Sequence, residues 1–112
     1  MIKLIGQDTV ISRSTLYAES FFQRLTGMLT RKFSDSLDGI VFRNCNAVHT
    51  FGIRFDIDVI FVDRTNRITE VYPDVKPWRT RSSGTSKAVT IELPSGSIAK
   101  FGIKCGDFVE FS

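Results

Sequence analysis

The side chains of this chain that could carry out chemistry are concentrated between positions 44 and 67. They are the single histidine, one of the two cysteines and three carboxylates: His49, Cys45, Asp56, Asp58 and Asp63. Thiol, imidazole and carboxylate groups ligate metals, transfer protons and attack carbonyl carbons, and they gather at functional sites. The sequence therefore places a candidate site here, although no catalytic or cofactor motif of known mechanism accompanies it.

Cys45 and His49 are both of the type that binds zinc. On a helix, residues four positions apart lie about 5–6 Å from each other and can share an ion. On a strand the same two residues would be about 13 Å apart. The residues around them disfavour a helix, so a shared metal would need an irregular turn and a further ligand such as Asp58. We therefore expect no metal site and no cofactor.

A thiol–imidazole pair is a second chemical interpretation, because an imidazole beside Cys45 would hold the thiolate ready to attack. The same separation along a strand argues against direct contact, and no glycine-rich elbow precedes Cys45. A metal-assisted or thiol-dependent hydrolase using Cys45 and His49 is kept as an alternative function. The simpler interpretation of His49 is structural, with its ring nitrogens bonded to the backbone or to a carboxylate such as Asp58.

Asp56 and Asp58 would share one face of a strand, about 7 Å apart. That separation resembles the spacing of glycosidase carboxylates, but a glycosidase also needs an aromatic sugar platform and one carboxyl group with a raised pKa. Neither is visible in the sequence. We expect these carboxylates to pair structurally with Arg54 or Arg79.

Trp78 lies among cations, and its neighbours include Lys76, Arg79 and Arg81. Such a group could stack on the bases of a single nucleic-acid strand. However, the formal charge of +3, from 15 Lys and Arg against 12 Asp and Glu, does not favour a dedicated nucleic-acid binder. A weak single-strand binder using the Trp78 loop is a second alternative. The simpler interpretation is that Trp78 closes one end of a barrel.

The elements that must position these side chains are mostly strands. Runs of β-branched and aromatic residues predict strands over Ile2–Leu4, Thr9–Tyr17, Gly39–Phe42, Ile57–Val62, Ile68–Tyr72, Ala88–Leu93 and Phe108–Phe111. Helical spacing predicts a short helix that begins after Ser20 and ends at Gly27, and one helical turn over Ser97–Phe101. Residues 79–87 are rich in Ser, Thr, Gly and Arg and predict an exposed loop.

The run Ile57–Val62 is almost continuously apolar, so it should be a central strand covered on both faces. The 112 residues suit one domain, and 42% hydrophobic residues with ten Phe can form one core. The fold class is therefore a mainly β single domain over 1–112, with minor helix. We expect a small antiparallel barrel-like or sandwich-like sheet of about seven short strands.

Five motifs resemble the successive motifs of the domain-of-unknown-function 192 family, also called UPF0127. They are RLTGM (24–28), VHTFGIRFDIDVIFVD (48–63), KPWR (76–79), IELPSG (91–96) and FGIKCGD (101–107). The resemblance implies a compact, mainly β domain without an established activity. One position departs from it: members often carry Pro where this chain has Asp56, a change that loosens the turn before the central strand.

We expect a binding module rather than an enzyme. Small barrels bind at their mouths and loops, so a cleft should form near Cys45, His49 and Arg79 and hold a small ligand or a protein partner. The candidate ligand-binding residues are Cys45, His49, Thr50, Arg54, Asp58, Trp78 and Arg79. No catalytic residue is assigned.

The sequence also predicts a cytoplasmic protein. Its first residues lack the apolar run of a secretory signal, and no segment approaches the roughly 20 apolar residues of a membrane span, so a membrane is not expected as a partner. Cys45 and Cys105 form no CxxC motif. In a reducing compartment we expect both to be free, buried thiols.

Overall fold

The computed structural model describes residues 1–18, 33–43, 47–49, 55–76, 79–84 and 89–112. The strands in these ranges form a three-stranded sheet ordered β10-β1-β2, a five-stranded sheet ordered β3-β4-β9-β6-β7, and the two-stranded pair β5-β8. Their bounds are β1 Ile2–Leu4, β2 Thr9–Ser12, β3 Thr15–Ala18, β4 Gly39–Phe42, β5 Ala47–His49, β6 Ile57–Val62, β7 Ile68–Val75, β8 Thr80–Ser82, β9 Val89–Pro94 and β10 Val109–Phe111. Helix α2 is Ser97–Phe101. The predicted mainly β class is confirmed, as an open sandwich.

Strand β6 is the apolar run that the sequence marks as central. All six of its residues are buried, and it pairs on one side with β7 and on the other with β9, in both cases antiparallel. Side chains alternate between the two faces of a strand, so β6 contributes to a core on each face of the sheet. This double burial explains why five of its six residues are apolar, with Asp58 as the exception.

The turn between β6 and β7 is held by one aspartate. Asp63 Oδ1 accepts hydrogen bonds from the Thr65 hydroxyl at 2.7 Å, from Thr65 N at 2.9 Å and from Arg67 N at 3.1 Å. Asn66 takes the left-handed conformation, with φ 66°, which Asn adopts more readily than most residues. The hydrogen bond from the Thr65 hydroxyl is the main cause of the lowered pKa of Asp63, and together with the bonds from the two amides it outweighs the opposing effect of burial. The predicted hairpin is confirmed.

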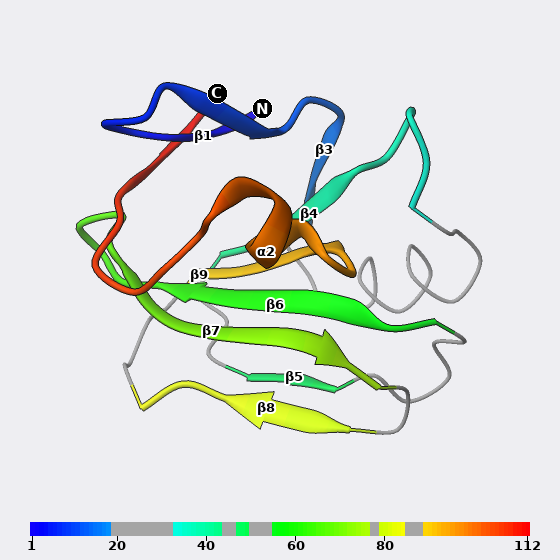
Figure 1. Cartoon of the computed structure of the whole chain (residues 1–112). Helices are drawn as coiled ribbons and strands as arrows, with labels where there is room; N and C mark the ends of the chain where they lie inside the picture. Colours follow the sequence, from blue (N-terminus) through cyan, green and yellow to red (C-terminus); the bar gives the residue numbers. More distant parts are fainter. Residues whose placement is uncertain (19–32, 44–46, 50–54, 77–78, 85–88) are drawn as a thin grey trace.

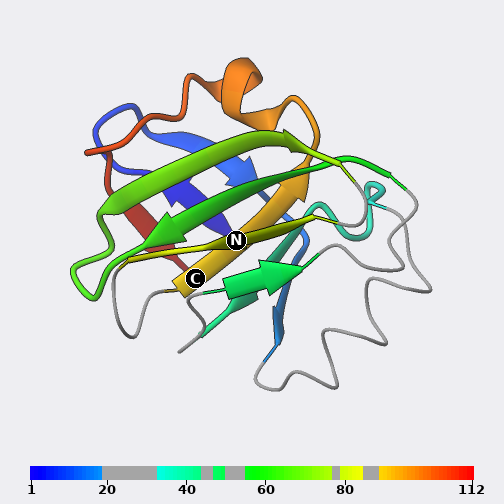
Figure 2. The ribbon, with the colours of Figure 1, turned by 90° about the horizontal axis from the view of Figure 1, so that it is seen from below.

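The five-stranded sheet separates two cores (Figure 1). The upper core lies between it and the three-stranded sheet, with α2 packed at its margin, and contains Ile2, Leu4, Ile11, Val41, Ile60, Val62, Ile68, Ile91, Leu93, Ile103 and Val109. The lower core lies on the opposite face and contains Ala18, Leu37, Ile40, Phe42, Ile57, Val59, Phe61 and Val75. The β5-β8 pair runs below this lower face (Figure 2).

Strands β3 and β4 pair in parallel, an exception to the mainly antiparallel expectation. The first residue of β4 must be a glycine, because it lies close to the end of β2. A Cβ built on Gly39 would overlap the Ser12 hydroxyl oxygen and lie 3.3 Å from Leu93 Cδ2. The side-chain-free residue therefore lets the two sheets meet at this corner.

The predicted strand Thr9–Tyr17 is divided into β2 and β3. The N–H groups of Arg13 and Ser14 bind the Asp38 carboxylate instead of a neighbouring strand, so the ladder stops between Ser12 and Thr15. This break turns the chain from the three-stranded sheet into the five-stranded one.

The prediction of a loop over 79–87 was wrong for Thr80–Ser82, which form β8. Their strand partner is β5, far away in the sequence, with Ala47 opposite Ser82 and His49 opposite Thr80. A pairing supplied by tertiary structure outweighs the polar local composition. Strand β7 also continues beyond the predicted Tyr72 to Val75 through Pro73, which an edge strand tolerates. The predicted helix Ser20–Gly27 lies outside the described residues.

Candidate functional site

The structure describes three of the seven candidate ligand-binding residues of the sequence. His49 is the last residue of β5, Asp58 is the second residue of β6, and Arg79 immediately precedes β8. The other four, Cys45, Thr50, Arg54 and Trp78, lie outside the described ranges.

The β5-β8 pair brings His49 and Arg79 to the same end of one ribbon. His49 is opposite Thr80, and Arg79 is the exposed residue next to Thr80. Arg81 is the middle residue of β8, and its guanidinium lies 5.6 Å from the centre of the Tyr72 ring on β7. A histidine position and two arginines that are remote from it in sequence are thus brought together on the β5-β8 ribbon.

Asp58 lies on the opposite face of the five-stranded sheet from the ribbon, and its carboxylate is 0% exposed. Its Oδ1 atom accepts hydrogen bonds from Asp74 N at 2.9 Å and Gly96 N at 3.3 Å, and Oδ2 accepts one from Ile98 N at 2.7 Å. The carboxylate therefore joins the ends of β6 and β7 to the start of α2. Asp58 holds backbone in place, and its position separates it from His49.

Asp56 does not share a strand with Asp58, because it precedes β6. Its Oδ2 atom is 2.5 Å from Lys76 Nζ, so this carboxylate forms an ion pair with a lysine, a partner that was not predicted beside Arg54 and Arg79. The pKa of Lys76 is raised, mainly by this hydrogen bond and then by the attraction between the two charges. Both groups are near solvent, where an ion pair contributes little to stability.

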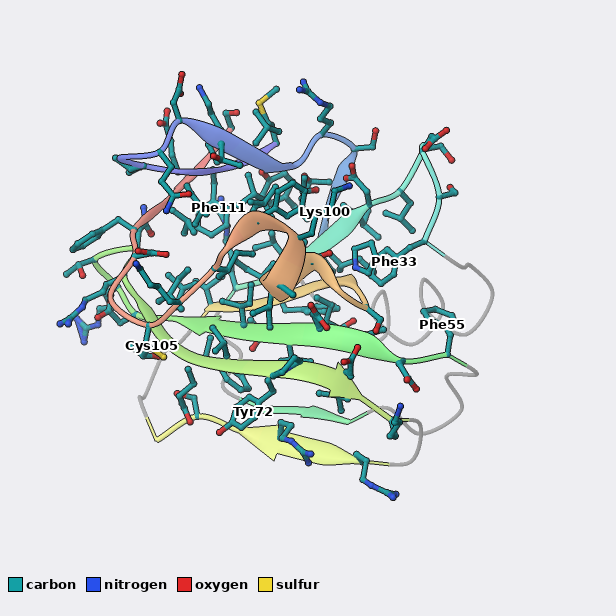
Figure 3. The ribbon with its side chains drawn as sticks, viewed as in Figure 1. Phe33, Phe55, Tyr72, Lys100, Cys105 and Phe111 are labelled. Carbon is teal, nitrogen blue, oxygen red and sulfur yellow. The ribbon has the colours of Figure 1, made fainter. Side chains whose placement is uncertain are left out.

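A cleft of about 400 Å³ lies beside α2, between the turn at residues 33–38 and the segment from Pro94 to Phe101. Its lining residues are Ile11, Phe33, Ser34, Asp35, Asp38, Pro94, Ser95, Gly96, Ser97, Lys100 and Phe101. Two of them, Phe33 and Lys100, are labelled in Figure 3. A volume of this order suits a small molecule.

The walls of the cleft are fixed by interactions beneath its surface. Asp58 holds the amides of Gly96 and Ile98, and Gly102 ends α2 in the left-handed conformation with φ 63°. On the other wall, the Phe33 ring meets the Phe55 ring edge-to-face, with 6.0 Å between their centres. Both walls are therefore positioned before any ligand enters.

Most polar side chains in the cleft already have partners. The Ser95 hydroxyl donates to the Asp74 carboxylate, and the Ser97 hydroxyl donates to the Pro94 carbonyl oxygen at 2.6 Å. Asp38 Oδ1 accepts from the Ser12 hydroxyl at 2.7 Å and Ser14 N at 2.9 Å, and Oδ2 accepts from Arg13 N at 3.2 Å. These groups shape the cleft and are not open to a ligand.

The hydrogen bonds to Asp38 make its contribution to stability depend on pH. Burial by itself would raise the pKa of Asp38, but the hydrogen bonds from Ser12, Arg13 and Ser14 outweigh it and hold the pKa below the ordinary 3.8. A group with a lowered pKa stabilises the fold above its unfolded pKa, and that stabilisation is lost as pH falls through the folded pKa.

We therefore expect Asp38→Asn to lower the free energy of unfolding by about 1–2 kcal/mol at pH 7. The difference from the parent chain should shrink as pH falls below the unfolded pKa, because the unfolded parent chain then binds a proton that the folded chain binds only at lower pH. Urea unfolding at pH 7, 5 and 3 measures this. An equal difference at pH 7 and pH 3 would show that the carboxylate charge is not the cause.

Two charged groups of the cleft remain open. Asp35 and Lys100 are both exposed, and neither forms an ion pair or a side-chain hydrogen bond with another residue that the structure describes. Lys100 Nζ lies 5.1 Å from the centre of the Phe101 ring. The cleft thus offers one carboxylate and one ammonium group beside apolar surface.

Within the described parts of the chain, no three His, Cys, Asp or Glu side chains lie close enough together to hold a metal ion. The same ranges contain no helix with the length and apolar content to cross a membrane. Cys105 is a free thiol, as expected, but it is exposed and its Sγ lies 3.4 Å from the Thr69 carbonyl oxygen. The expectation that it is buried was wrong, because the turn that carries it lies against the edge of β7.

A family model for DUF192, described as Uncharacterized ACR, matches residues 5–111. The chain belongs to the DUF192 family. A UPF0127 protein of Thermococcus kodakarensis is 27% identical over 99 residues, which cover 85% of this chain and 62% of that relative. The chain therefore spans less than two thirds of the length of this curated relative. The resemblance noted from the five motifs is confirmed.

The DUF192 domain is also similar in fold to two solved structures. A protein of unknown function from Novosphingobium aromaticivorans has a TM-score of 0.78 at 20% identity, over 98% of this chain and 83% of that one. A candidate transcription regulator from Sinorhizobium meliloti has a TM-score of 0.81 at 19% identity, over 97% of this chain and 90% of that one. At these identities the likeness concerns the fold alone.

The sequence reasoning about this DUF192 domain missed the cleft beside α2. Phe33, Asp35 and Lys100 belong to segments that are far apart in the chain, and none has a neighbour of the kind that marks a catalytic motif. The reasoning also missed Glu92, a carboxylate in β9 that is 0% exposed. A charged residue inside the apolar run VTIELP was the available signal, since buried carboxylates are uncommon.

Proposed function

We propose that this DUF192 domain is a non-catalytic module that binds a small ligand in the cleft beside α2. The observation that carries the proposal is a concavity of about 400 Å³ whose lining combines aromatic rings with an open carboxylate and an open ammonium group. Ligand sites typically combine apolar walls with a few polar groups that fix orientation. The proposal keeps the ligand binding expected from the sequence but places the binding site beside α2 instead of near Cys45.

The hydrogen bonds of the cleft support binding rather than catalysis. A serine nucleophile needs an adjacent general base that is itself oriented. The Ser97 hydroxyl instead donates to a backbone carbonyl oxygen, and the Ser95 hydroxyl donates to the carboxylate of Asp74. The described lining offers ligand contacts but no activated nucleophile.

The β5-β8 ribbon supports a second candidate, the weak binding of single-stranded nucleic acid. Arg81 already stacks on Tyr72, and the Arg79 side chain is exposed beside it. Guanidinium groups near an aromatic ring can contact phosphates and bases. The solved neighbour described as a candidate transcription regulator has the same fold, which agrees with this candidate at the level of fold.

The cleft can be tested by screening small fragments for binding with ligand-observed NMR. We expect several fragments to bind the parent chain and to be lost in Ser34→Trp, because the indole would fill the cleft that Ser34 lines. The matched control is Glu110→Trp, which adds the same ring at an exposed position on β10 and should keep the fragments.

Fragments that bind Ser34→Trp as well as they bind the parent chain would contradict the proposal, and so would a screen without binders. A deoxythymidine oligomer belongs in the same series. If it binds the parent chain and Ser34→Trp equally, with an affinity that falls steeply with salt, the β5-β8 ribbon becomes the preferred site.

A further inference from the structure

The two open charges of the cleft lie on opposite walls. Asp35 belongs to the turn at residues 33–38, whereas Lys100 belongs to α2. Figure 3 shows Phe33, from the first wall, and Lys100, from the second, at the cleft that both line. A ligand that fills the cleft would meet a carboxylate on one side and an ammonium group on the other.

This pair of charges selects against ligands with a single charge. An anion held by Lys100 would also meet the carboxylates of Asp35 and Asp38, whereas a cation held by Asp35 would leave Lys100 without a counter-charge. A ligand that carries both signs satisfies both walls, and ionised partners form the stronger hydrogen bonds. The remaining polar groups are already bonded within the protein, so the ligand does not have to supply hydrogen bonds to them.

The surface between the two charges is apolar. Ile11 is buried and Phe33, Pro94 and Phe101 are half-buried, and all four line the cleft. Their side chains would cover an aliphatic or aromatic body, while the volume of about 400 Å³ lies at the lower end of the range for small-molecule sites, roughly 300–1,000 Å³. The ligand is therefore small and has an apolar part.

We infer that the cleft binds a small zwitterion with an apolar side chain, namely an α-amino acid or a dipeptide. Its ammonium group would bind Asp35, its carboxylate would bind Lys100, and its side chain would pack on Phe33 and Phe101. The inference rests on the proposed function and adds the class of ligand. Binding is non-covalent and changes no bond in the ligand.

Isothermal titration calorimetry of the full 112-residue chain tests this with L-phenylalanine and the dipeptide Phe-Leu. N-acetylphenylalaninamide, which lacks both charges, is the blocked probe. We expect at least one of the two zwitterions to bind at least ten times more tightly than the blocked probe. Phenylalaninamide keeps only the ammonium group, and N-acetylphenylalanine keeps only the carboxylate.

Two variants assign the charges. Asp35→Asn should weaken binding of the zwitterion and of phenylalaninamide at least fivefold but should not weaken binding of N-acetylphenylalanine. Lys100→Met should weaken binding of the zwitterion and of N-acetylphenylalanine but not of phenylalaninamide. The controls are Asp8→Asn and Lys104→Met, at exposed positions that do not line the cleft, and they should change none of the affinities.

The outcomes separate the two proposals. If the blocked probe binds as tightly as the zwitterions and Ser34→Trp removes it, the ligand class is wrong and the binding cleft stands. If the fragments bind in the cleft but no amino acid or dipeptide does, the ligand class is likewise wrong. If neither these probes nor the fragments bind, both proposals are overturned.

Discussion

Replacing Asp58 with alanine is expected to lower the free energy of unfolding by about 3 kcal/mol. The change removes the acceptor of three backbone N–H groups, those of Asp74, Gly96 and Ile98. An unsatisfied buried donor costs about 1–3 kcal/mol. Asp74 and Gly96 are exposed residues, so their amides can bond water instead. The expected total loss is therefore well below three times the upper cost of one buried donor. Urea unfolding at neutral pH measures the loss.

Asp58→Asn distinguishes the hydrogen bonds from the volume of the side chain. Asparagine keeps one oxygen acceptor, but its amide group faces an N–H donor instead of accepting from it. We expect this variant to fall between the parent chain and Asp58→Ala. Glu110→Ala, at an exposed carboxylate, should change the free energy of unfolding by less than about 0.5 kcal/mol. An alanine variant as stable as the parent chain would show that Asp58 does not hold α2 in place.

Replacing Phe61 with alanine is expected to lower the free energy of unfolding by about 3–5 kcal/mol. Phe61 is 0% exposed, belongs to the lower core, and meets the Tyr72 ring edge-to-face with 6.0 Å between ring centres. Alanine would remove the ring from β6 and leave a cavity that the paired strands on both sides prevent from collapsing. Chemical denaturation monitored by circular dichroism provides the value.

Two further substitutions test whether this loss comes from burial. Phe61→Leu keeps much of the apolar volume and should be less destabilising than Phe61→Ala. Phe108→Ala removes a ring that is 44% exposed, so we expect a loss below about 1 kcal/mol. Equal losses for Phe61→Ala and Phe108→Ala would mean that the lower core is not packed around Phe61.

The two large effects concern opposite faces of the same strand. Phe61 points into the lower core, whereas Asp58 binds the segment that forms one wall of the cleft. Loss of Asp58 should therefore weaken ligand binding as well as stability, because Gly96 lines the cleft. Loss of Phe61 should act on stability alone as long as the chain stays folded.

The strands were predictable from the sequence where local pattern and burial agree. Ile57–Val62 and Gly39–Phe42 have the predicted bounds, since a run of apolar residues without polar alternation fits a strand that is covered on both faces. The turn before β7 and the helical turn at Ser97–Phe101 were equally visible. The Asp63 carboxylate can bond the backbone of its turn, and Gly102, without a side chain, can adopt the left-handed conformation that ends a helix.

The ribbon and the break between β2 and β3 were not predictable in this way. Thr80–Ser82 form a strand because β5 is available as a partner, and a pairing between remote segments leaves no trace in local composition. The break at Arg13 and Ser14 depends on a carboxylate from Asp38. Both features result from contacts between distant residues.

The sequence by itself determined the mainly β architecture, the central strand, the hairpin turn and the family. The first three follow from periodicity, side-chain volume and turn chemistry, each of which acts between neighbouring residues, and the family follows from the resemblance of the five motifs. Only the tertiary structure decided that Asp58 binds backbone amides away from His49 and that Asp35 and Lys100 line one cleft. The physical reason is that a cleft is formed by the packing of remote segments, whereas local pattern specifies only the segments themselves.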